Sequence, residues 1–290
     1  MAGLAAWFVW RWIGNPDPIR EGSPAWAPDS RRIAYYAEQP DGHADLFVRE
    51  RDGSQVVQLT RTPADEGGPS WSPDGTQIAF DSDRDGNFEI YAMPAAPDAA
   101  ARRLTSHPGR DLAPAWSPDG RTIAFMSDRE SHPEFDIFLM EADGSNVRRL
   151  TPAPSAWFPQ FSPDGTRLAF HLWRDVHLIH FSSGRSQRLT TDPLNGMYPT
   201  WSPDGRRLAF MTWRNGPTEI FTMGADGGEQ TRLVGMPTGS AIDPRWSPDG
   251  RHIAFVSVPG QTVHASPDAS QQRVIYVVEL ATGRMRRLHR

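Results

Sequence analysis

The sequence contains no cysteine and no lysine, and it has no apolar run long enough to cross a membrane. Without cysteine, disulfide bonds, thiolate metal sites and a cysteine nucleophile are all excluded. All 30 basic residues are arginine, which is typical of codon bias in a GC-rich genome. With a net charge of −5, the chain also lacks the basic excess expected of a general nucleic-acid-binding surface.

What the chain does contain is an internal repeat. A turn motif of the form Trp-Ser-Pro-Asp-Gly, with small variations, begins at Trp26, Trp71, Trp116, Phe161, Trp201 and Trp246. Nine residues after each opening aromatic comes a second one, at Tyr35, Phe80, Phe125, Phe170, Phe210 and Phe255. Two further apolar runs complete each unit. A period of about 45 residues with four apolar runs is typical of a propeller blade.

Each unit is predicted to form four short strands joined by turns. In Ser-Pro-Asp-Gly, proline presets the first turn position and glycine accepts the left-handed backbone conformation. The first unit has Ser30 in place of glycine, which predicts strain or a looser turn there. A four-stranded sheet cannot bury both faces alone, so the units must stack into a ring. The sequence therefore predicts an all-β fold, a six-bladed β-propeller of four-stranded antiparallel blades over residues 21–290.

On these residues, the chain resembles the TolB-like, or PD40, propeller repeats of bacterial proteins, which are WD40-like. The resemblance implies an exported protein of the cell envelope that binds other proteins, because such relatives include periplasmic interaction proteins. Such relatives also include propellers that gate serine peptidases. Those enzymes need a second domain with a Gly-x-Ser-x-Gly nucleophile motif, which is missing here.

Departures from the repeat indicate where a partner binds. At the hairpin between the second and third strands, the other blades favour an acid, but the fourth and fifth have Trp173-Arg174 and Trp213-Arg214. The connections that enter these two blades add Trp157, Phe158, Met197 and Tyr198. Trp, Tyr and Arg are enriched in interface hot spots, so these eight residues predict a partner-binding patch on one face. The alternative is that the rings fill gaps left by the shortened fourth blade.

Acidic residues are expected near the opposite side of the channel mouth. Glu66, Asp111 and Asp243 begin or lie near the first strands of their blades, and we expect them to line the opening with negative charge. Arginines of the fourth strands, such as Arg148 and Arg149, are expected on the outer rim, where charge discourages edge pairing.

Two segments bear some similarity to metal sites. His171, His177 and His180 lie within ten residues, but alternation along strands prevents all three from converging. Residues 81–89 mimic the start of a calcium loop but follow the hairpin consensus of the repeat instead. No metal and no cofactor is predicted, although calcium at residues 81–89 remains an alternative.

Residues 1–20 precede the repeats and are rich in tryptophan. Trp7, Phe8, Trp10 and Trp12 suit a membrane–water interface or a hydrophobic partner. As a helix, the apolar stretch 4–13 would span about 15 Å, half of the hydrocarbon core. The alternative is a segment docked on the propeller itself.

Together these features predict a non-catalytic scaffold propeller of the bacterial envelope. It would bind a protein partner, at the periplasmic face of a membrane complex, and associate peripherally with the membrane. The alternative is a metal-dependent lyase or hydrolase with its site in the propeller channel.

Overall fold

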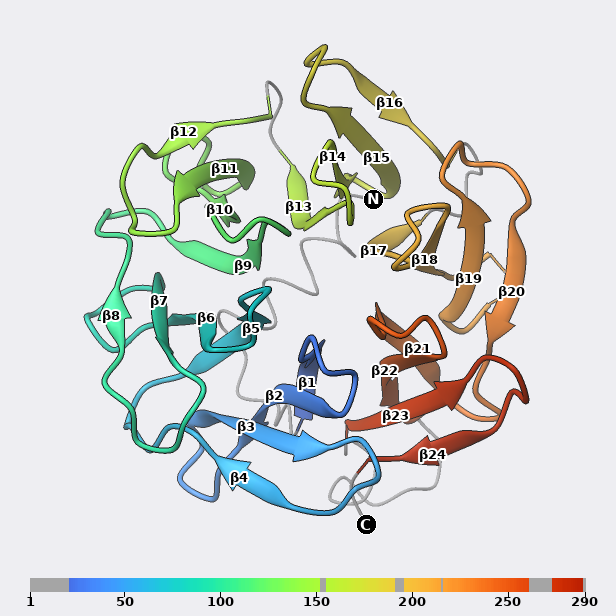
Figure 1. Ribbon diagram of the computed structural model, residues 1–290, viewed down its shortest axis with the longest axis horizontal. Coiled ribbons are helices and arrows are strands. Elements are labelled where there is room, and N and C mark those ends of the chain that lie inside the picture. Colours follow the sequence, from blue (N-terminus) through green and yellow to red (C-terminus); the bar gives the residue numbers. More distant parts are fainter. Residues whose placement is uncertain (1–20, 152–154, 191–195, 215, 261–272, 289–290) are drawn as a thin grey trace.

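The computed structural model describes residues 21–151, 155–190, 196–214, 216–260 and 273–288. These residues form six four-stranded antiparallel sheets around a central channel, which confirms the predicted six-bladed propeller (Figure 1). The described residues contain no helix that could cross a membrane. The predicted segment 1–20, with Trp7, Phe8, Trp10 and Trp12, lies outside the described residues.

The strands of each blade follow one another from the channel to the rim, and we call them A to D in that order. The A strands are β1 (Glu21–Trp26), β5 (Glu66–Trp71), β9 (Asp111–Trp116), β13 (Ala156–Phe161), β17 (Met197–Trp201) and β21 (Ser240–Trp246). The B strands are β2 (Arg32–Glu38), β6 (Gln77–Ser82), β10 (Thr122–Ser127), β14 (Arg167–Leu172), β18 (Arg207–Thr212) and β22 (His252–Val258).

The two outer strands of each blade complete the sheet. The C strands are β3 (Ala44–Glu50), β7 (Glu89–Pro94), β11 (Asp136–Glu141), β15 (Asp175–His180), β19 (Glu219–Gly224) and β23 (Val274–Glu279). The D strands are β4 (Val56–Gln58), β8 (Arg102–Arg103), β12 (Arg148–Arg149), β16 (Ser186–Arg188), β20 (Thr231–Val234) and β24 (Met285–Arg287). The D strands are short, and their arginines Arg148 and Arg149 stand at the rim as expected.

The A–B turns have the predicted chemistry. In blade 2, the Gly75 N–H donates to the carbonyl of Ser72, and Gly75 has a φ of 70°. Ser30 takes the same place in blade 1 with a φ of 59°, so a side chain is held in the left-handed region there. The strain predicted for this turn is thus present in the backbone.

The hydrophobic core lies between blades rather than within them. One cluster joins Tyr36 and Leu46 of blade 1 to Trp71 and Phe80 of blade 2, and similar clusters follow around the ring. The second aromatic of each repeat is at the centre of these clusters and is almost fully buried. Neighbouring blades therefore stabilise one another by burying their apolar faces.

The ring closes between blades 6 and 1 without a shared strand, because each sheet uses four consecutive strands. The closing contacts are direct: Trp26 Nε1 donates to the Arg245 carbonyl at 3.0 Å, and the Ile275 N–H donates to Glu21 Oε2 at 3.2 Å.

Candidate functional site

Six equivalent residues of the A strands surround the channel. They are Ser23, Gly68, Ala113, Phe158, Tyr198 and Asp243, and all six have φ between 47° and 53°. At each of them the pairing between strands A and B shifts by a bulge. We call these six residues the channel ring. The ring is asymmetric, since three members are small and three carry an aromatic or acidic side chain.

A proline follows every member of the channel ring, at Pro24, Pro69, Pro114, Pro159, Pro199 and Pro244. Proline has no N–H to donate, so a bulge in the strand is where it fits best. This repeated proline is a signal in the sequence that could have located the channel ring.

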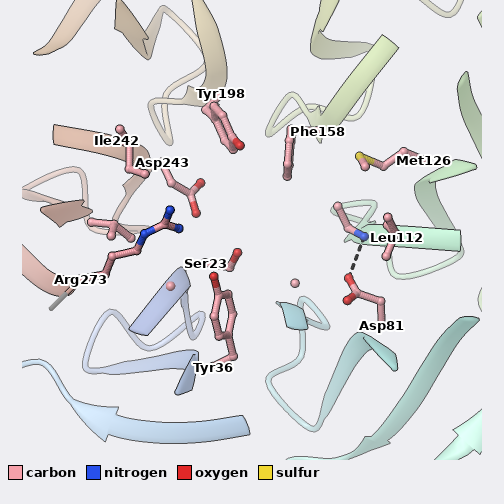
Figure 2. A pocket seen from close by; sticks show the side chains of 14 residues that line it. Ser23, Tyr36, Asp81, Leu112, Met126, Phe158, Tyr198, Ile242, Asp243 and Arg273 are labelled. Atoms are coloured by element: carbon pink, nitrogen blue, oxygen red, sulfur yellow. Dashed lines mark hydrogen bonds between the residues drawn. The ribbon is translucent and has the colours of Figure 1, made fainter. Parts of the chain in front are cut away.

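The channel ring separates two cavities. Ser23, Gly68, Ala113 and Phe158 line both of them, while Tyr198 and Asp243 line only the one toward the B–C hairpins. The opposite cavity is walled by tryptophans of the repeat, such as Trp26 and Trp71. Figure 2 shows the cavity on the hairpin side, which we call the channel cavity.

Asp81 is a channel-cavity residue that sequence reasoning placed in a hairpin. Its side chain is 1% exposed, and its Oδ2 accepts the Ala113 N–H at 2.9 Å (Figure 2). A Cβ on Gly68 would lie 2.4 Å from the same oxygen, so only glycine fits beside this carboxyl. Burial raises the pKa of Asp81 to about 7, against the lowering effect of the Ala113 N–H.

His171 lies below the aromatic half of the channel ring. It stacks against Phe158 and Tyr198, with ring centroids 5.6 Å and 5.5 Å away, and is 1% exposed. Its Nδ1 is placed to accept the Tyr198 N–H at 3.4 Å, at the outer limit of a hydrogen bond. Burial lowers the pKa of His171 to about 3, so the ring is neutral.

The acids predicted to line the channel mouth are arranged differently. Glu66 and Asp111 are buried and line neither cavity, so that prediction is wrong for both. Each forms a 2.6 Å ion pair with an arginine of its own B–C hairpin, Arg84 or Arg129. Because buried charges need partners, these acids are held inside the blade by the hairpin arginines.

Asp243 is the one of the three that lines the channel cavity. Its Oδ1 lies 2.8 Å from Nη1 of Arg245. Burial raises the pKa of Asp243, and the charge of Arg245 opposes this effect. Asp81 lines the same cavity from the other side.

The predicted aromatic patch is partly buried. Trp157, Met197 and Tyr198 are buried, so the expectation that they form an exposed surface is wrong. The reason is that they belong to A strands rather than to loops. Trp157 packs on Phe135 with centroids 4.8 Å apart, and Tyr198 packs on the half-buried Phe158 at 4.2 Å. These rings fill space between neighbouring blades.

The B–C hairpins of blades 4 and 5 keep the surface part of the patch. Trp173 is 56% exposed, and Arg174 lies over the half-buried Trp213 ring at 5.6 Å. Arg214 lies over Phe221 at 4.7 Å and donates to Gln230 Oε1. We call Trp173, Arg174 and Trp213 the hairpin patch.

The hairpin arginine is placed differently in blade 4 than in blades 2 and 3, and the cause is the residue at the start of strand A. In blades 2 and 3 the residue there is Glu66 or Asp111, which pairs with the hairpin arginine. In blade 4 that residue is Ala156, so no acid draws Arg174 inward. The arginine lies instead across the aromatic ring of the next blade.

Trp173 also has a strained backbone. It is the first residue of a two-residue turn between β14 and β15, with a φ of 57°. Glycine is the preferred residue at such a position. A bulky, exposed side chain held in this conformation is a feature that recurs at functional sites.

The three histidines of blade 4 do not converge. His171 faces the channel ring, whereas His177 lies near Phe170, with centroids 5.7 Å apart, and next to Ser186 of the rim strand. Among the described residues, no group of three His, Asp or Glu side chains could hold a metal ion. The absence of a metal cofactor stays a prediction.

The fold and the site define a six-bladed β-propeller with a closed ring, a divided channel and one aromatic–arginine hairpin face. The TolB beta propeller domain, PD40, matches residues 23–158 and 153–277. The chain therefore belongs to the PD40 family. No curated protein matches the chain.

Solved structures similar to the chain share its fold at low sequence identity. A putative TolB from Agrobacterium tumefaciens is 22% identical, with a TM-score of 0.73 over 92% of this chain and 89% of that chain. TolB from Acinetobacter baumannii is 20% identical, with a TM-score of 0.72 over 88% of this chain and 62% of that chain. An oligogalacturonate lyase in complex with manganese is 16% identical, with a TM-score of 0.62 over 92% and 76%.

Proposed function

We propose that this chain is a non-catalytic protein-binding propeller that docks its partner on the hairpin patch. The observation that carries the proposal is the exposed Trp173 beside Arg174, which is stacked on Trp213. Trp and Arg are the residue types that contribute most binding energy when a partner covers them. The strain at Trp173 supports a binding role, because a glycine would satisfy the same turn at lower cost.

The remaining predicted contacts extend this proposal. Arg214 follows Trp213 of the hairpin patch in the chain, and Phe158 belongs to the channel ring; both would contact a partner that reaches toward the channel. The buried Trp157, Met197 and Tyr198 would support that surface from below. Its family supports a location in the periplasm, and we propose that it works there at the face of a membrane complex. Residues 1–20 would hold it at the membrane.

The test is affinity purification of the protein from membranes, followed by identification of the subunits that co-purify. The wild type is compared with a Trp173→Ala, Trp213→Ala double variant. The matched control is Val56→Ala, because Val56 is an exposed apolar residue on the D strand of blade 1. We expect the double variant to lose the partner and the control to keep it. Retention of the partner by the double variant would contradict the proposed surface.

A metal-dependent lyase or hydrolase would require a set of metal ligands facing the channel. The described residues offer no such cluster of three, and the structural similarity to the manganese-bound lyase is one of fold. The two functions are separated by elemental mass spectrometry of the purified protein. One bound metal per chain, retained after dialysis, would favour the enzyme.

A further inference from the structure

The channel cavity has the kind of lining that binds small polar molecules. It contains about 660 Å³ of space free of protein atoms, part of it open to solvent. Small-molecule sites usually have mostly apolar walls and a few polar groups. The cavity fits this description, because Leu112, Met126 and Val256 line it together with carboxyl, hydroxyl and guanidinium groups.

One side of the cavity presents a carboxyl oxygen without a partner. Asp81 Oδ2 is occupied by the Ala113 N–H, but its Oδ1 is buried and accepts no hydrogen bond within the described part of the chain. A buried carboxyl oxygen without a donor is costly. Figure 2 shows the carboxyl group at the edge of the cavity, which Asp81 lines.

The other side presents a guanidinium group. Arg273, immediately before β23 of blade 6, extends into the cavity from the side opposite Asp81 (Figure 2). It forms no hydrogen bond or ion pair with any residue that the structure describes. Asp243, the acid nearest to it in Figure 2, is already paired with Arg245 at 2.8 Å. Because Asp243 is paired, Asp81 and Arg273 are the acid and the base of the cavity that remain for a ligand.

The wall between these two charges is apolar and aromatic. Phe158 and Tyr198 stand together there, with centroids 4.2 Å apart, and Leu112 and Met126 continue the wall toward Asp81. Such a wall fits the carbon skeleton of a small molecule. A peptide segment in mid-chain has no pair of opposite terminal charges to satisfy both ends of the cavity.

We propose that the channel cavity binds a small zwitterion of the amino-acid class, with its ammonium group on Asp81 and its carboxylate on Arg273. The apolar part of the ligand lies against Phe158 and Leu112. A ligand of this kind supplies the missing donor to Asp81 Oδ1 and the missing acceptor to Arg273. This binding activity is separate from the partner surface on the hairpin patch.

Isothermal titration calorimetry of the purified full chain tests the proposal with each of the twenty proteinogenic amino acids. The amino acid that binds best is then compared with its amide, which lacks the carboxylate, and with its des-amino acid, which lacks the ammonium group. We expect each analogue to bind the wild type at least about tenfold more weakly, as loss of a charged hydrogen bond predicts.

Two variants assign the ends of the ligand. Asp81→Asn should abolish the preference for the amino acid over its des-amino analogue and leave the preference over the amide. Arg273→Gln should do the reverse. The matched controls are Asp98→Asn on blade 2 and Arg284→Gln on blade 6, both exposed and outside the cavity, which should bind as the wild type does.

Several results would overturn the proposal. Failure of all twenty amino acids to bind at millimolar concentration is one, and equal binding of the amino acid and both analogues is another. Binding of simple carboxylic acids alone would assign an anion site instead. The analogue series on the wild type gives this answer even if a variant does not fold, and circular dichroism identifies such a variant.

Discussion

Asp81 and His171 occupy the same position in the B strands of blades 2 and 4, and each is placed to accept the N–H of the channel-ring residue in the next blade. Both side chains are buried, but they respond to burial in opposite directions. The pKa of Asp81 is raised to about 7, and the pKa of His171 is lowered to about 3. At pH 5 the folded chain therefore holds a proton on Asp81 and none on His171.

This pair predicts an unusual pH dependence. In the unfolded chain at pH 5, the aspartate is ionised and the histidine carries the proton. The folded and unfolded states thus bind the same number of protons at these two sites. The contribution of Asp81 to the free energy of unfolding is largest at low pH and is lost as the pH rises toward 7. The contribution of His171 is largest above pH 6.5 and is lost as the pH falls below that value. From about pH 4 to pH 6.5 the two effects offset each other.

Asp81→Asn should expose the pH dependence of stability that His171 contributes and that Asp81 offsets in the wild type. Relative to wild type, we expect the free energy of unfolding to rise with pH by about 1.4 kcal/mol per unit between pH 4 and pH 6.5. His171→Gln should change the slope in the opposite direction. Urea unfolding at pH 4.5, 5.5 and 6.5 gives both slopes. Parallel curves for wild type and Asp81→Asn would show that Asp81 titrates normally.

Ser30→Gly should stabilise the protein. Ser30 holds a φ of 59° at the turn position where the blade 2 repeat has Gly75. Relief of this strain is expected to raise the free energy of unfolding by about 0.5–1 kcal/mol. Chemical denaturation measures the change, and Gly75→Ser should lower stability by a similar amount. A less stable Ser30→Gly variant would mean that the serine side chain contributes more than the strain costs.

Trp173→Gly should separate stability from binding. The substitution removes a bulky side chain from a φ of 57°, so we expect the fold to be stabilised by about 1 kcal/mol. Partner binding should weaken at least tenfold, because a hot-spot tryptophan is lost. Thermal denaturation and partner capture are measured on the same preparation. A loss of both stability and binding would indicate that Trp173 is structural.

Arg129→Gln should be strongly destabilising. The substitution leaves Asp111 buried without its 2.6 Å ion pair, and the pKa of this acid is already raised to about 6 by burial. Loss of one partner of a buried pair costs about 3–5 kcal/mol. The Asp111→Asn, Arg129→Gln double variant should recover part of this, and urea unfolding compares the two. Equal stability of Arg129→Gln and wild type would show that the pair is dispensable.

The propeller was predictable because its cause is local and repeated. The turn at Trp71 and the buried Phe80 recur at a fixed spacing, and each repeat must pack on the next. The site was less predictable, because a bulge redirects the chain at positions such as Tyr198. At the bulge, side chains do not alternate between the two faces of the strand. Residues that the sequence pattern assigns to loops therefore lie in A strands and form the channel wall.

Side-chain pairing caused the remaining error. Glu66 and Arg84 are 18 residues apart, and nothing in either residue alone shows that they meet. Once the register of strands A and B is known, the pairing follows from the opposition of Glu66 and Ser82. The exposure of Trp173, by contrast, follows from the shortened hairpin that the sequence already showed.

The way the ring closes has a consequence for how the chain can be rearranged. Each blade is made from a continuous stretch of chain, and blades 6 and 1 meet as any two neighbours do, through contacts such as Trp26 with Arg245. No blade is first in such a ring. A circular permutant, in which Leu288 is linked to Glu21 and the chain begins at another blade, should therefore fold with the same channel and the same hairpin patch.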